Sequence, residues 1–303
     1  MVDLEIGLML PTMSEKDRSP GDIVAAARYA EDLGFESVWV VDQLIAGTGA
    51  PLLDSITALA AAAAVTERIR LGVGVLVLPL RPVAWVAKQV ATLQHLSGDR
   101  VILGVGVGGD RHNRSWAAVG VPSRERGRRT DDALRVLPDL IAGKPVQLGY
   151  ASDTPTQLGP AAAVPPIIAG GMSDAAVRRA AAHDGWFLLA SPAEIPAQLT
   201  RLGEQAAAAG RATPPATTSA VVALDGDRSL PDHATIVRSL CDPDGMFAMS
   251  AEYAEESLVH GDPGFVAGYL NGMAARGVRR VVVTLVGGDW FRQADLLART
   301  LKG

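Results

Sequence analysis

The 303-residue chain is 48% hydrophobic and only 5% aromatic, so it has enough aliphatic material for a large core and is not a disordered chain. Its formal net charge of −5 and its mostly scattered basic residues argue against a surface that binds nucleic acid or a membrane. We therefore expect small molecules as partners.

Cysteine usage and the first apolar run indicate the compartment. The single cysteine, Cys241, excludes an internal disulfide framework, and no Cys/His spacing resembles a metal site. The first apolar run carries Asp3 and Glu5 and lacks the basic segment and cleavage site of a secretion signal. No apolar stretch reaches the roughly 18 residues that a membrane span needs. We expect a cytoplasmic protein.

Short runs of Val, Ile and Leu alternate with longer alanine-rich amphipathic segments, which is the pattern of repeated βα units with a parallel sheet. Eight strands are predicted, at 4–10, 37–42, 69–78, 100–107, 166–171, 185–190, 217–225 and 278–288. Eight helices are predicted within 19–35, 53–67, 83–98, 123–141, 174–185, 192–210, 263–276 and 289–301.

Capping residues set several of these helix boundaries. Ser19 is the predicted N-cap of the first helix, and Gly34 is its C-terminal cap. Asp54 or Ser55 lies in the first turn of the second helix, and Gly98 ends the third.

The count of eight units favours a (β/α)₈ TIM barrel over an open doubly wound sheet, because a six-stranded Rossmann sheet would leave two units over. We predict one domain over residues 1–303, with excursions at 142–166 and 226–262 that leave after strands four and seven. Ligands of such barrels bind at the C-terminal ends of the strands. Both excursions are expected to wall the pocket there.

Glycines recur at four predicted strand ends: Gly72 and Gly74, Gly104, Gly106 and Gly108, Gly170 and Gly171, and Gly287 and Gly288. The match of Gly104-x-Gly106-x-x-Gly109 to a dinucleotide fingerprint is weak, because no helix begins at these glycines. A flat ring lying across the barrel mouth would touch several strand ends at once, and glycine lets the backbone approach a ligand closely. The alternative is that the glycines only relieve crowding at the narrow neck of the barrel.

The stretch "AGGMSDAAV" (169–177) combines two glycines, the Ser173 hydroxyl and the start of a helix. The free N–H groups of a helix start favour an anion, so this turn is a candidate phosphate site. The alternative is that Ser173 or Asp174 is an ordinary N-cap.

Four stretches together resemble the luciferase-like monooxygenase superfamily, within it the branch of coenzyme F420-dependent oxidoreductases and related flavin-dependent enzymes. They are "YAEDLGFESVWVVDQ" (29–43), "TERIRLGVGVLVLPLRPVAWVAKQVATLQHLSGDRVILGVGVGG" (66–109), "GVPSRERGRRTDDAL" (120–134) and "PPIIAGGMSDAAVRRAAAHDGW" (165–186). They cover most of residues 1–190, whereas the C-terminal third matches only in its strand rhythm.

The resemblance implies a TIM-like barrel, usually a homodimer, that binds F420 or alternatively FMN at its C-terminal mouth. The phosphate would lie at the turn after strand five and the ring against strands three and four, with a non-proline cis peptide at Gly74–Val75. The cofactor-binding residues that follow are Asp42, Gly74, Val75, Leu76, Gly106, Val107, Gly108, Ala169, Gly170, Gly171, Met172 and Ser173. Asp42 differs from the other residues of this set, because we expect its side chain to fix a neighbouring loop.

The sequence departs from the family pattern at two strand ends. Many F420 enzymes of this type end strand two with Asp-His, whereas Asp42 is followed here by Gln43. The sugar-phosphate dehydrogenases of the family have a Glu after strand four, where this chain has Gly109 and Asp110. Because a neutral amide does not exchange a proton near neutral pH, we do not expect sugar-phosphate dehydrogenase activity.

The candidate catalytic residues near the mouth are Gln43, Asp110 and His112. The ordinary pKa of a histidine suits proton transfer, although a solvated loop residue is the alternative for His112. A run of arginines at 124, 126, 128 and 129 is typical of a solvated helix face paired with Asp131 and Asp132. In the family this segment can also lie near the anionic side chain of F420.

Three functions remain open. The first is an F420-dependent oxidoreductase that transfers a hydride between the deazaflavin and a small organic substrate. The second is an FMN-dependent monooxygenase of the same fold, which needs a reductase partner to supply reduced flavin. The third is a barrel that binds a cofactor without catalysis.

Overall fold

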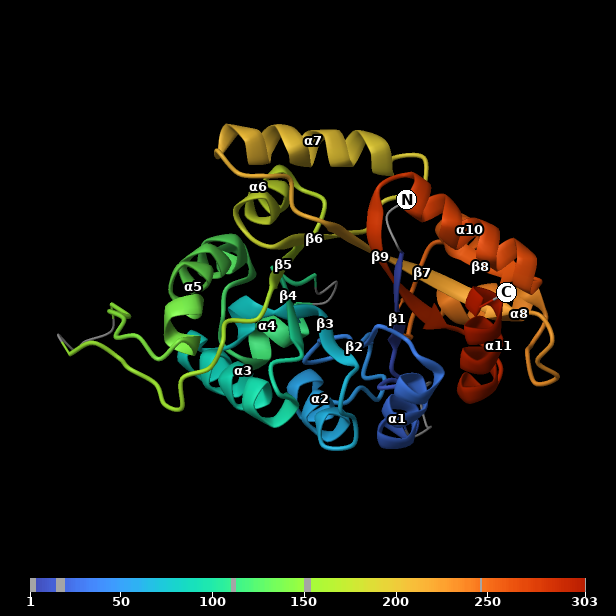
Figure 1. Ribbon diagram of the computed structural model, residues 1–303, viewed down its shortest axis with the longest axis horizontal. Coiled ribbons are helices and arrows are strands. Elements are labelled where there is room, and N and C mark those ends of the chain that lie inside the picture. The colour runs from blue at the N-terminus through green and yellow to red at the C-terminus, as the bar shows by residue number, and fades with distance from the viewer. Residues whose placement is uncertain (1–3, 15–19, 110–112, 150–153, 246, 303) are drawn as a thin grey trace.

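The computed structural model describes residues 4–14, 20–109, 113–149, 154–245 and 247–302. Eight parallel strands form a closed barrel, because β6 pairs with β7, β7 with β9, and β9 with β1 (Figure 1). The barrel strands are β1 (Glu5–Met9), β2 (Ser37–Val40), β3 (Arg70–Val77), β4 (Val101–Gly106), β5 (Ile167–Gly170), β6 (Gly185–Leu188), β7 (Ala216–Leu224) and β9 (Val278–Leu285). Each overlaps its predicted range, so the predicted TIM barrel is confirmed.

A ninth strand, β8 (Leu258–Gly261), lies outside the barrel. It pairs with the C-terminal half of β7 from Val221 to Leu224, beyond the last pairing of β7 with β6 at Thr218. The sequence analysis missed this strand, which has only four residues and lies within the 226–262 excursion. The helical pieces expected in that excursion are present as α8 (His233–Cys241) and α9 (Ala251–Ser257).

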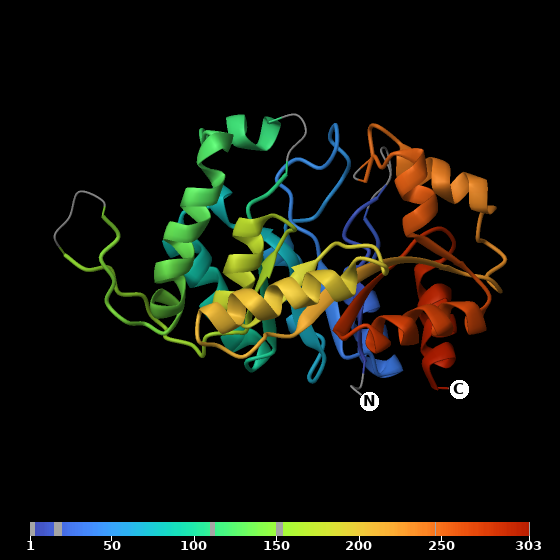
Figure 2. The ribbon, with the colours of Figure 1, turned by 90° about the horizontal axis from the view of Figure 1, so that it is seen from above.

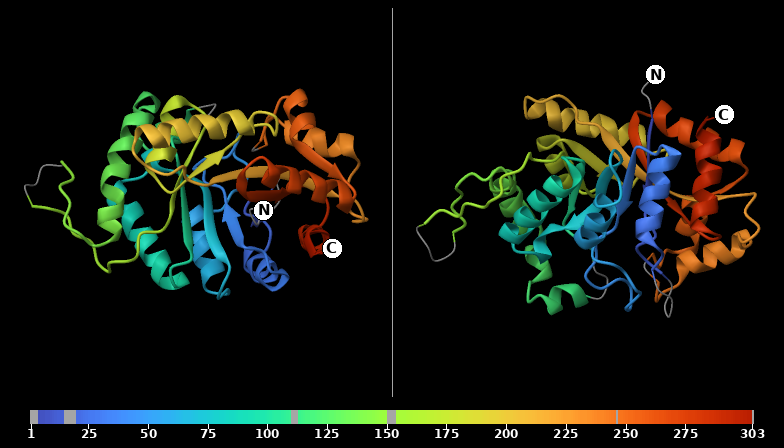
Figure 3. Two further views of the ribbon diagram at one scale, coloured as in Figure 1. Left: turned by 45° about the horizontal axis from the view of Figure 1, so that its top comes forward. Right: turned by 60° about the horizontal axis from the view of Figure 1, so that its bottom comes forward.

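An outer layer of helices surrounds the barrel, from α1 in blue to α11 in red (Figure 3). Its members are α1 (Ile23–Leu33), α2 (Ser55–Ala63), α3 (Val83–Ser97), α5 (Arg126–Ile141), α6 (Asp174–Ala182), α7 (Ile195–Ala208), α10 (Pro263–Ala275) and α11 (Trp290–Lys302). Three short helical pieces complete the described chain: η1 (Leu78–Leu80), α4 (Arg114–Ala118) and η2 (Ser123–Glu125). None of the helices in the described ranges has the length and apolar character required to cross a bilayer.

The helix caps agree with the sequence analysis except at the first helix. The N-cap of α1 is Asp22, whose Oδ1 accepts a hydrogen bond of 3.0 Å from the N–H of Ala25. The prediction of Ser19 as this cap is wrong, because the helix begins at Ile23 and its N-cap is Asp22. Ser19 itself lies outside the described residues. A carboxylate at Asp22 satisfies the free N–H of the first turn as well as a hydroxyl does.

The excursion at 142–166 does not wall the mouth as expected. It leaves the C-terminal end of α5 and enters the N-terminal end of β5, and both points lie at the base of the barrel, opposite the mouth. From there it runs out beside α5, away from the barrel (Figure 2). The error arose because α5 runs antiparallel to the strands, so a segment after that helix starts at the base. The 226–262 excursion does leave from the mouth.

Trp39 fills the centre of the barrel and is fully buried. Its indole packs edge-on against Phe187 with ring centroids 5.7 Å apart, and its Nε1–H donates to Ser37 Oγ at 2.7 Å. The ring fits because β1 and β3 carry glycines beside it: a Cβ at Gly7 or Gly72 would lie within 2.3–2.5 Å of the nearest indole atom. These glycines therefore serve packing inside the barrel.

The crowding at Trp39 makes a measurable prediction. We expect Gly72→Ala to lower the free energy of unfolding by about 1–3 kcal/mol, because the new methyl group overlaps the indole. The matched control is Gly268→Ala in α10, where a Cβ meets nothing within 4 Å; it should raise stability by about 0.5–1 kcal/mol. Urea denaturation of both variants measures the difference, and equal stabilities would contradict the packing assigned to Trp39.

Candidate functional site

The side chain of Val75 occupies the mouth of the barrel between β3, β4 and β5. The register of β3 against β4 shifts between Val73 and Leu76, and the Gly74–Val75 peptide is cis, as the resemblance implied. Val75 is half-buried and packs on the cluster of apolar side chains around Trp39. The barrel thus presents one aliphatic side chain upward at this point.

The glycines of β4 and β5 surround Val75. A Cβ at Gly104, Gly106 or Gly170 would lie 3.0, 2.6 or 3.0 Å from a methyl carbon of Val75. A Cβ at Gly74 would instead lie 3.0 Å from Phe187 Cε2. These glycines therefore relieve crowding around Val75 and Phe187, and their contact with a cofactor ring stays a prediction. The same absence of side chains leaves the upper face of Val75 open at the mouth.

Two of the predicted cofactor-binding residues contribute their side chains to the core. Leu76 is fully buried and Ala169 is 1% exposed, and both pack in the main hydrophobic cluster. Only their backbone could meet a ligand. Val107 and Gly108 follow β4 at the mouth and are half-buried; Gly108 has a φ of +73°, and a Cβ there would lie 2.5 Å from Val77 Cγ1.

Asp42 is committed to holding the end of β3. Its buried carboxylate accepts hydrogen bonds from Ser55 Oγ at 2.8 Å and from the N–H of Val77 at 2.8 Å, and it pairs with Arg81 at 2.6 Å. Arg81 also pairs with Asp54, the N-cap of α2. The expectation that Asp42 fixes a neighbouring loop is confirmed, and this carboxylate positions the strand that carries Val75.

The candidate catalytic residues are only partly placed. Gln43 directly follows Asp42, is half-buried, and its amide has no hydrogen-bond partner among the residues that the structure describes. Asp110 and His112 lie outside the described residues, so their roles stay predictions. The chain returns at α4, where Trp116 is 3% exposed and packs near Gly108.

The turn after β5 is held firmly by its carbonyl groups. Gly171 has a φ of +115°, and its carbonyl accepts from Trp186 Nε1 at 2.7 Å. The carbonyl of Met172 accepts from Arg201, which also pairs with Asp174. Ser173 is the N-cap of α6, and its Oγ accepts from the N–H of Ala176 at 3.3 Å. The N–H groups of Asp174 and Ala175, in the same first turn, have no hydrogen-bond partner among the described residues.

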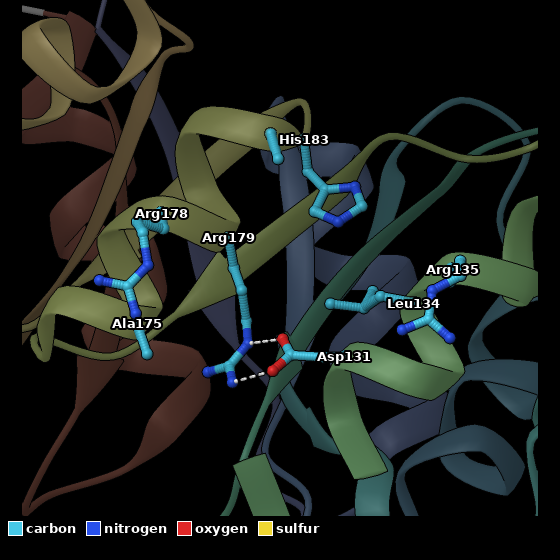
Figure 4. Close-up of a pocket in the computed structure, with 8 residues that line it drawn as sticks. Asp131, Leu134, Arg135, Ala175, Arg178, Arg179 and His183 are labelled. Carbon is cyan, nitrogen blue, oxygen red and sulfur yellow. Dashed lines mark hydrogen bonds and ion pairs between the residues drawn. The ribbon is translucent and has the colours of Figure 1, made fainter. Parts of the chain in front are cut away.

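An ion pair on the outside of the barrel positions α6. Figure 4 shows a hollow between α5 and α6, crossed by the bidentate pair of Arg179 and Asp131 at 2.6 and 3.0 Å. The hydrogen bonds from Arg179 lower the pKa of Asp131 despite some burial, so the pair is charged at neutral pH. This pair links the last turn of α6, whose N-cap is Ser173, to Asp131 of α5.

The arginine run on α5 divides into paired and unpaired members. Arg128 pairs with Glu125 and with Asp132, as expected of a solvated helix face. Asp131 pairs with Arg179 on α6 instead of with a member of the run. Arg129 Nε donates to the carbonyl of Pro79 at 3.3 Å, so the first turn of α5 lies beside the C-terminal end of β3. Within the described ranges, Arg124 and Arg126 are exposed and have no partner.

A cavity of about 540 Å³ opens at the mouth on the side of β1 and β9. Its floor is formed by the ends of these strands, and its outer wall by Leu240 of α8 and by Phe247. The sequence analysis ended the first predicted strand at residue 10, next to this cavity, but could not identify the wall residues. No local pattern in 226–262 indicates which of its side chains turn toward the barrel.

A buried carboxylate fixes the edge of this cavity. Asp227, in the loop after β7, accepts from the N–H and Oγ of Ser229 at 2.9 and 2.7 Å and from the N–H of Asp289 at 2.9 Å. Burial alone would raise the pKa of Asp227, but the bonds from Ser229, Asp289 and Gln293 lower it to about 2. The turn at Gly287 and Gly288, which lines the cavity, is thereby tied to β7.

Comparison with known proteins identifies relatives of the chain. The family model of the luciferase-like monooxygenases matches residues 4–279. An uncharacterized protein of Mycobacterium tuberculosis is 38% identical over 182 residues, which make up 59% of this chain and 62% of that protein. The chain thus spans less than two thirds of the length of this curated relative.

One further relative and one solved structure carry names with an activity. The F420-dependent glucose-6-phosphate dehydrogenase of Beutenbergia cavernae is 38% identical over 141 residues, which cover 45% of this chain and 41% of that enzyme. The crystal structure of the monooxygenase RslO1 from Streptomyces bottropensis has a TM-score of 0.82 at 21% identity and covers 99% of both chains. At this identity the likeness to the second shows the fold alone.

The packing of Val75 predicts coupling between two positions. Gly106→Ala should destabilise the protein by about 1–3 kcal/mol, because its Cβ would lie 2.6 Å from Val75 Cγ2. The double variant Val75→Ala and Gly106→Ala should recover part of that loss, since the two Cβ atoms would be 3.7 Å apart. A double-mutant cycle of unfolding free energies should give a coupling of about 1 kcal/mol, and strictly additive effects would refute the contact.

The low pKa of Asp227 predicts the pH dependence of stability. A carboxylate whose pKa is lowered on folding stabilises the fold above its ordinary pKa and loses this contribution as the pH falls through about 2. We expect Asp227→Asn to melt at a lower temperature than the wild type at pH 6, and to lose less stability between about pH 4 and pH 2. Asp295→Asn, which removes an exposed pair with Arg299, is the control and should follow the wild-type slope.

Proposed function

We propose that this chain, which belongs to the luciferase-like monooxygenase family, is an F420-dependent oxidoreductase that transfers a hydride between the deazaflavin and a small organic substrate. The observation that carries the proposal is the platform at the mouth, where Val75 stands among glycines of β4 and β5 next to the start of α6. The platform fits a planar ring, and the helix start fits an anionic group attached to it.

The fit of the ring rests on shape and on polarity. The upper face of Val75 is aliphatic, and Gly106 and Gly170 add no side chain that would obstruct a flat molecule beside it. The bonds of Asp42 to Val77 and Arg81 hold β3 in place below. A rigid support matters because hydride transfer requires close and reproducible approach of donor and acceptor carbons.

The fit of the phosphate rests on the turn after β5. Its carbonyls are occupied by Trp186 and Arg201, so the groups left to face a ligand are the N–H groups at the start of α6 and the hydroxyl hydrogen of Ser173. These are hydrogen-bond donors at the positive end of a helix dipole, which is the chemistry that binds phosphate.

F420 is favoured over FMN by charge beside the platform. Arg124 of η2 and Arg126, the first residue of α5, are exposed and lack partners among the described residues. The first turn of α5 contacts η1, which follows β3, through Arg129 and Pro79. Both cofactors carry a phosphate, but the side chain of F420 has further anionic groups that FMN lacks, and these guanidinium groups would attract them. A relative that shares 38% identity over 141 residues is named as F420-dependent.

The chemistry of the reaction is divided between cofactor and protein. When bound, F420 supplies the hydride acceptor or donor. The chain would bind and orient the ring, exclude water, and supply at most one proton donor. Gln43 can orient a substrate through its amide, while Asp110 and His112, next in the chain after β4, remain the proposed proton donors.

An FMN-dependent monooxygenase is the second candidate, favoured by the fold shared with the monooxygenase RslO1. It would require a reductase partner. A homodimer is part of either proposal, on the resemblance of the chain to its family.

Cofactor titration tests the proposal. We expect purified protein to quench F420 fluorescence on binding and to bind FMN more weakly. The double variant Arg124→Ala and Arg126→Ala should bind F420 roughly tenfold more weakly at low salt and bind FMN unchanged, because exposed charges act mainly on the anionic side chain. Arg135→Ala is the matched control, since Arg135 lies on the same helix and pairs with Asp132.

The outcomes separate the candidates. Tight binding of FMN with no binding of F420 would favour the monooxygenase. Binding of neither cofactor would support a barrel without this activity. An unchanged F420 affinity of the double variant would remove the role assigned to Arg124 and Arg126.

A further inference from the structure

We propose that the cavity on the β1 and β9 side of the mouth binds the substrate, and that this substrate is uncharged, largely apolar and carries one carbonyl or hydroxyl group. The inference rests on the proposed function for what happens to the bound molecule, but its evidence is the cavity itself. Its volume of about 540 Å³ falls in the range of small-molecule sites.

The cavity adjoins the platform. Met9, at the end of β1, lines the cavity and also packs on the same apolar cluster as Val75. Val41, which follows β2, lines it as well. A molecule in the cavity would therefore lie next to a ring supported by Val75.

The described walls of the cavity are largely apolar and carry no positive charge. The nonpolar lining residues include Leu10, Leu240, Phe247, Leu285 and Val286. Among the described lining residues there is no Lys, Arg or His, and the one charged side chain is Asp242, which is exposed and whose Oδ1 accepts from the N–H of Asp244. A carboxylate or phosphate bound here would lose its hydration without gaining a counter-charge.

One buried hydroxyl is available to a ligand. Thr12 is 1% exposed and lines the cavity, and its Oγ has no hydrogen-bond partner among the described residues. Every described side-chain nitrogen or oxygen that is sealed off in the protein does have a partner. The Thr12 Oγ is therefore not fully enclosed by protein, and the cavity that Thr12 lines is the space from which a ligand could reach it.

A threonine hydroxyl both donates and accepts, so it can bind a carbonyl oxygen or a hydroxyl group. Thr284, half-buried at the end of β9, is a second hydroxyl on the same wall. By contrast the indole N–H of Trp290, which also lines the cavity, is already used in a bond of 3.1 Å to the carbonyl of Met9. The polar contacts on offer are thus hydroxyl groups, which suit a neutral ligand.

Ligand-observed NMR titration with matched ring compounds tests the inference without requiring turnover. Cyclohexanone and cyclohexanol should bind at least ten times more tightly than cyclohexanecarboxylate at pH 7.5, with and without saturating F420. Thr12→Val should weaken cyclohexanone binding by roughly five- to tenfold through loss of one hydrogen bond and leave F420 affinity unchanged. Thr200→Val is the matched control, because Thr200 is an exposed residue of α7 that does not line the cavity, and it should change neither affinity.

A charge variant protects the test against misfolding of Thr12→Val. Val286→Lys adds an ammonium group to the half-buried wall and should reverse the preference, so that cyclohexanecarboxylate binds more tightly than cyclohexanone. Thermal midpoints within a few degrees of the wild type would establish that the variants fold.

Three results would overturn the inference. The first is that the wild type binds cyclohexanecarboxylate as tightly as cyclohexanone or more tightly, and the second is that it does not bind cyclohexanone. The third is that folded Thr12→Val keeps the wild-type affinity for cyclohexanone while folded Val286→Lys shows no reversal of the preference. The proposed function fails separately. A protein that binds neither F420 nor FMN but still selects cyclohexanone through Thr12 would refute the cofactor assignment and retain the cavity assignment.

Discussion

The mouth of this barrel depends on the space made for one side chain. Val75 rises from the irregular end of β3 and can stand there only because Gly104, Gly106 and Gly170 on the two following strands lack a Cβ. Any larger residue at these three positions would meet the methyl groups of Val75 at or within 3.0 Å. Packed interiors tolerate little overlap, so the position of Val75 requires glycine at these three positions.

The same constraint operates one layer deeper. The indole of Trp39 fits inside the barrel because Gly7 and Gly72 leave room for it. Val75 packs on the apolar cluster that contains Trp39. Below it, Arg280 lies 5.8 Å from the Trp39 ring centroid and pairs with Glu5 and Glu36, which closes the base with charge. Apolar crowding thus supports the mouth from beneath, and the ion pairs of Arg280 lie at the base.

The sequence predicted the features that repeat or follow a local rule. The strand rhythm gave the barrel, Gly34 and Gly98 gave helix ends, and the resemblance placed the cis peptide at Gly74–Val75. It could not show that Gly106 and Gly170 share a neighbour, because this contact joins three strands far apart in the chain. The sequence analysis also missed β8 and the place of Phe247 in the cavity wall. Both lie in the 226–262 excursion, whose apolar residues follow no helix or strand periodicity, and both are defined by contacts with distant parts of the chain.

The acidic residues near the mouth are mostly engaged in structure, and this limits what the site can do. Asp42 holds β3, Asp227 holds the turn at Gly288, and Asp54 caps α2 while pairing with Arg81. Hydrogen bonds keep the pKa of Asp54 and that of Asp227 low, so neither carboxyl group holds a proton to give near neutral pH. A mouth built in this way leaves an apolar cavity, a few hydroxyl and amide groups, and a firmly held platform. In the described part of the mouth these groups can orient a neutral molecule, which agrees with the substrate proposed for the cavity.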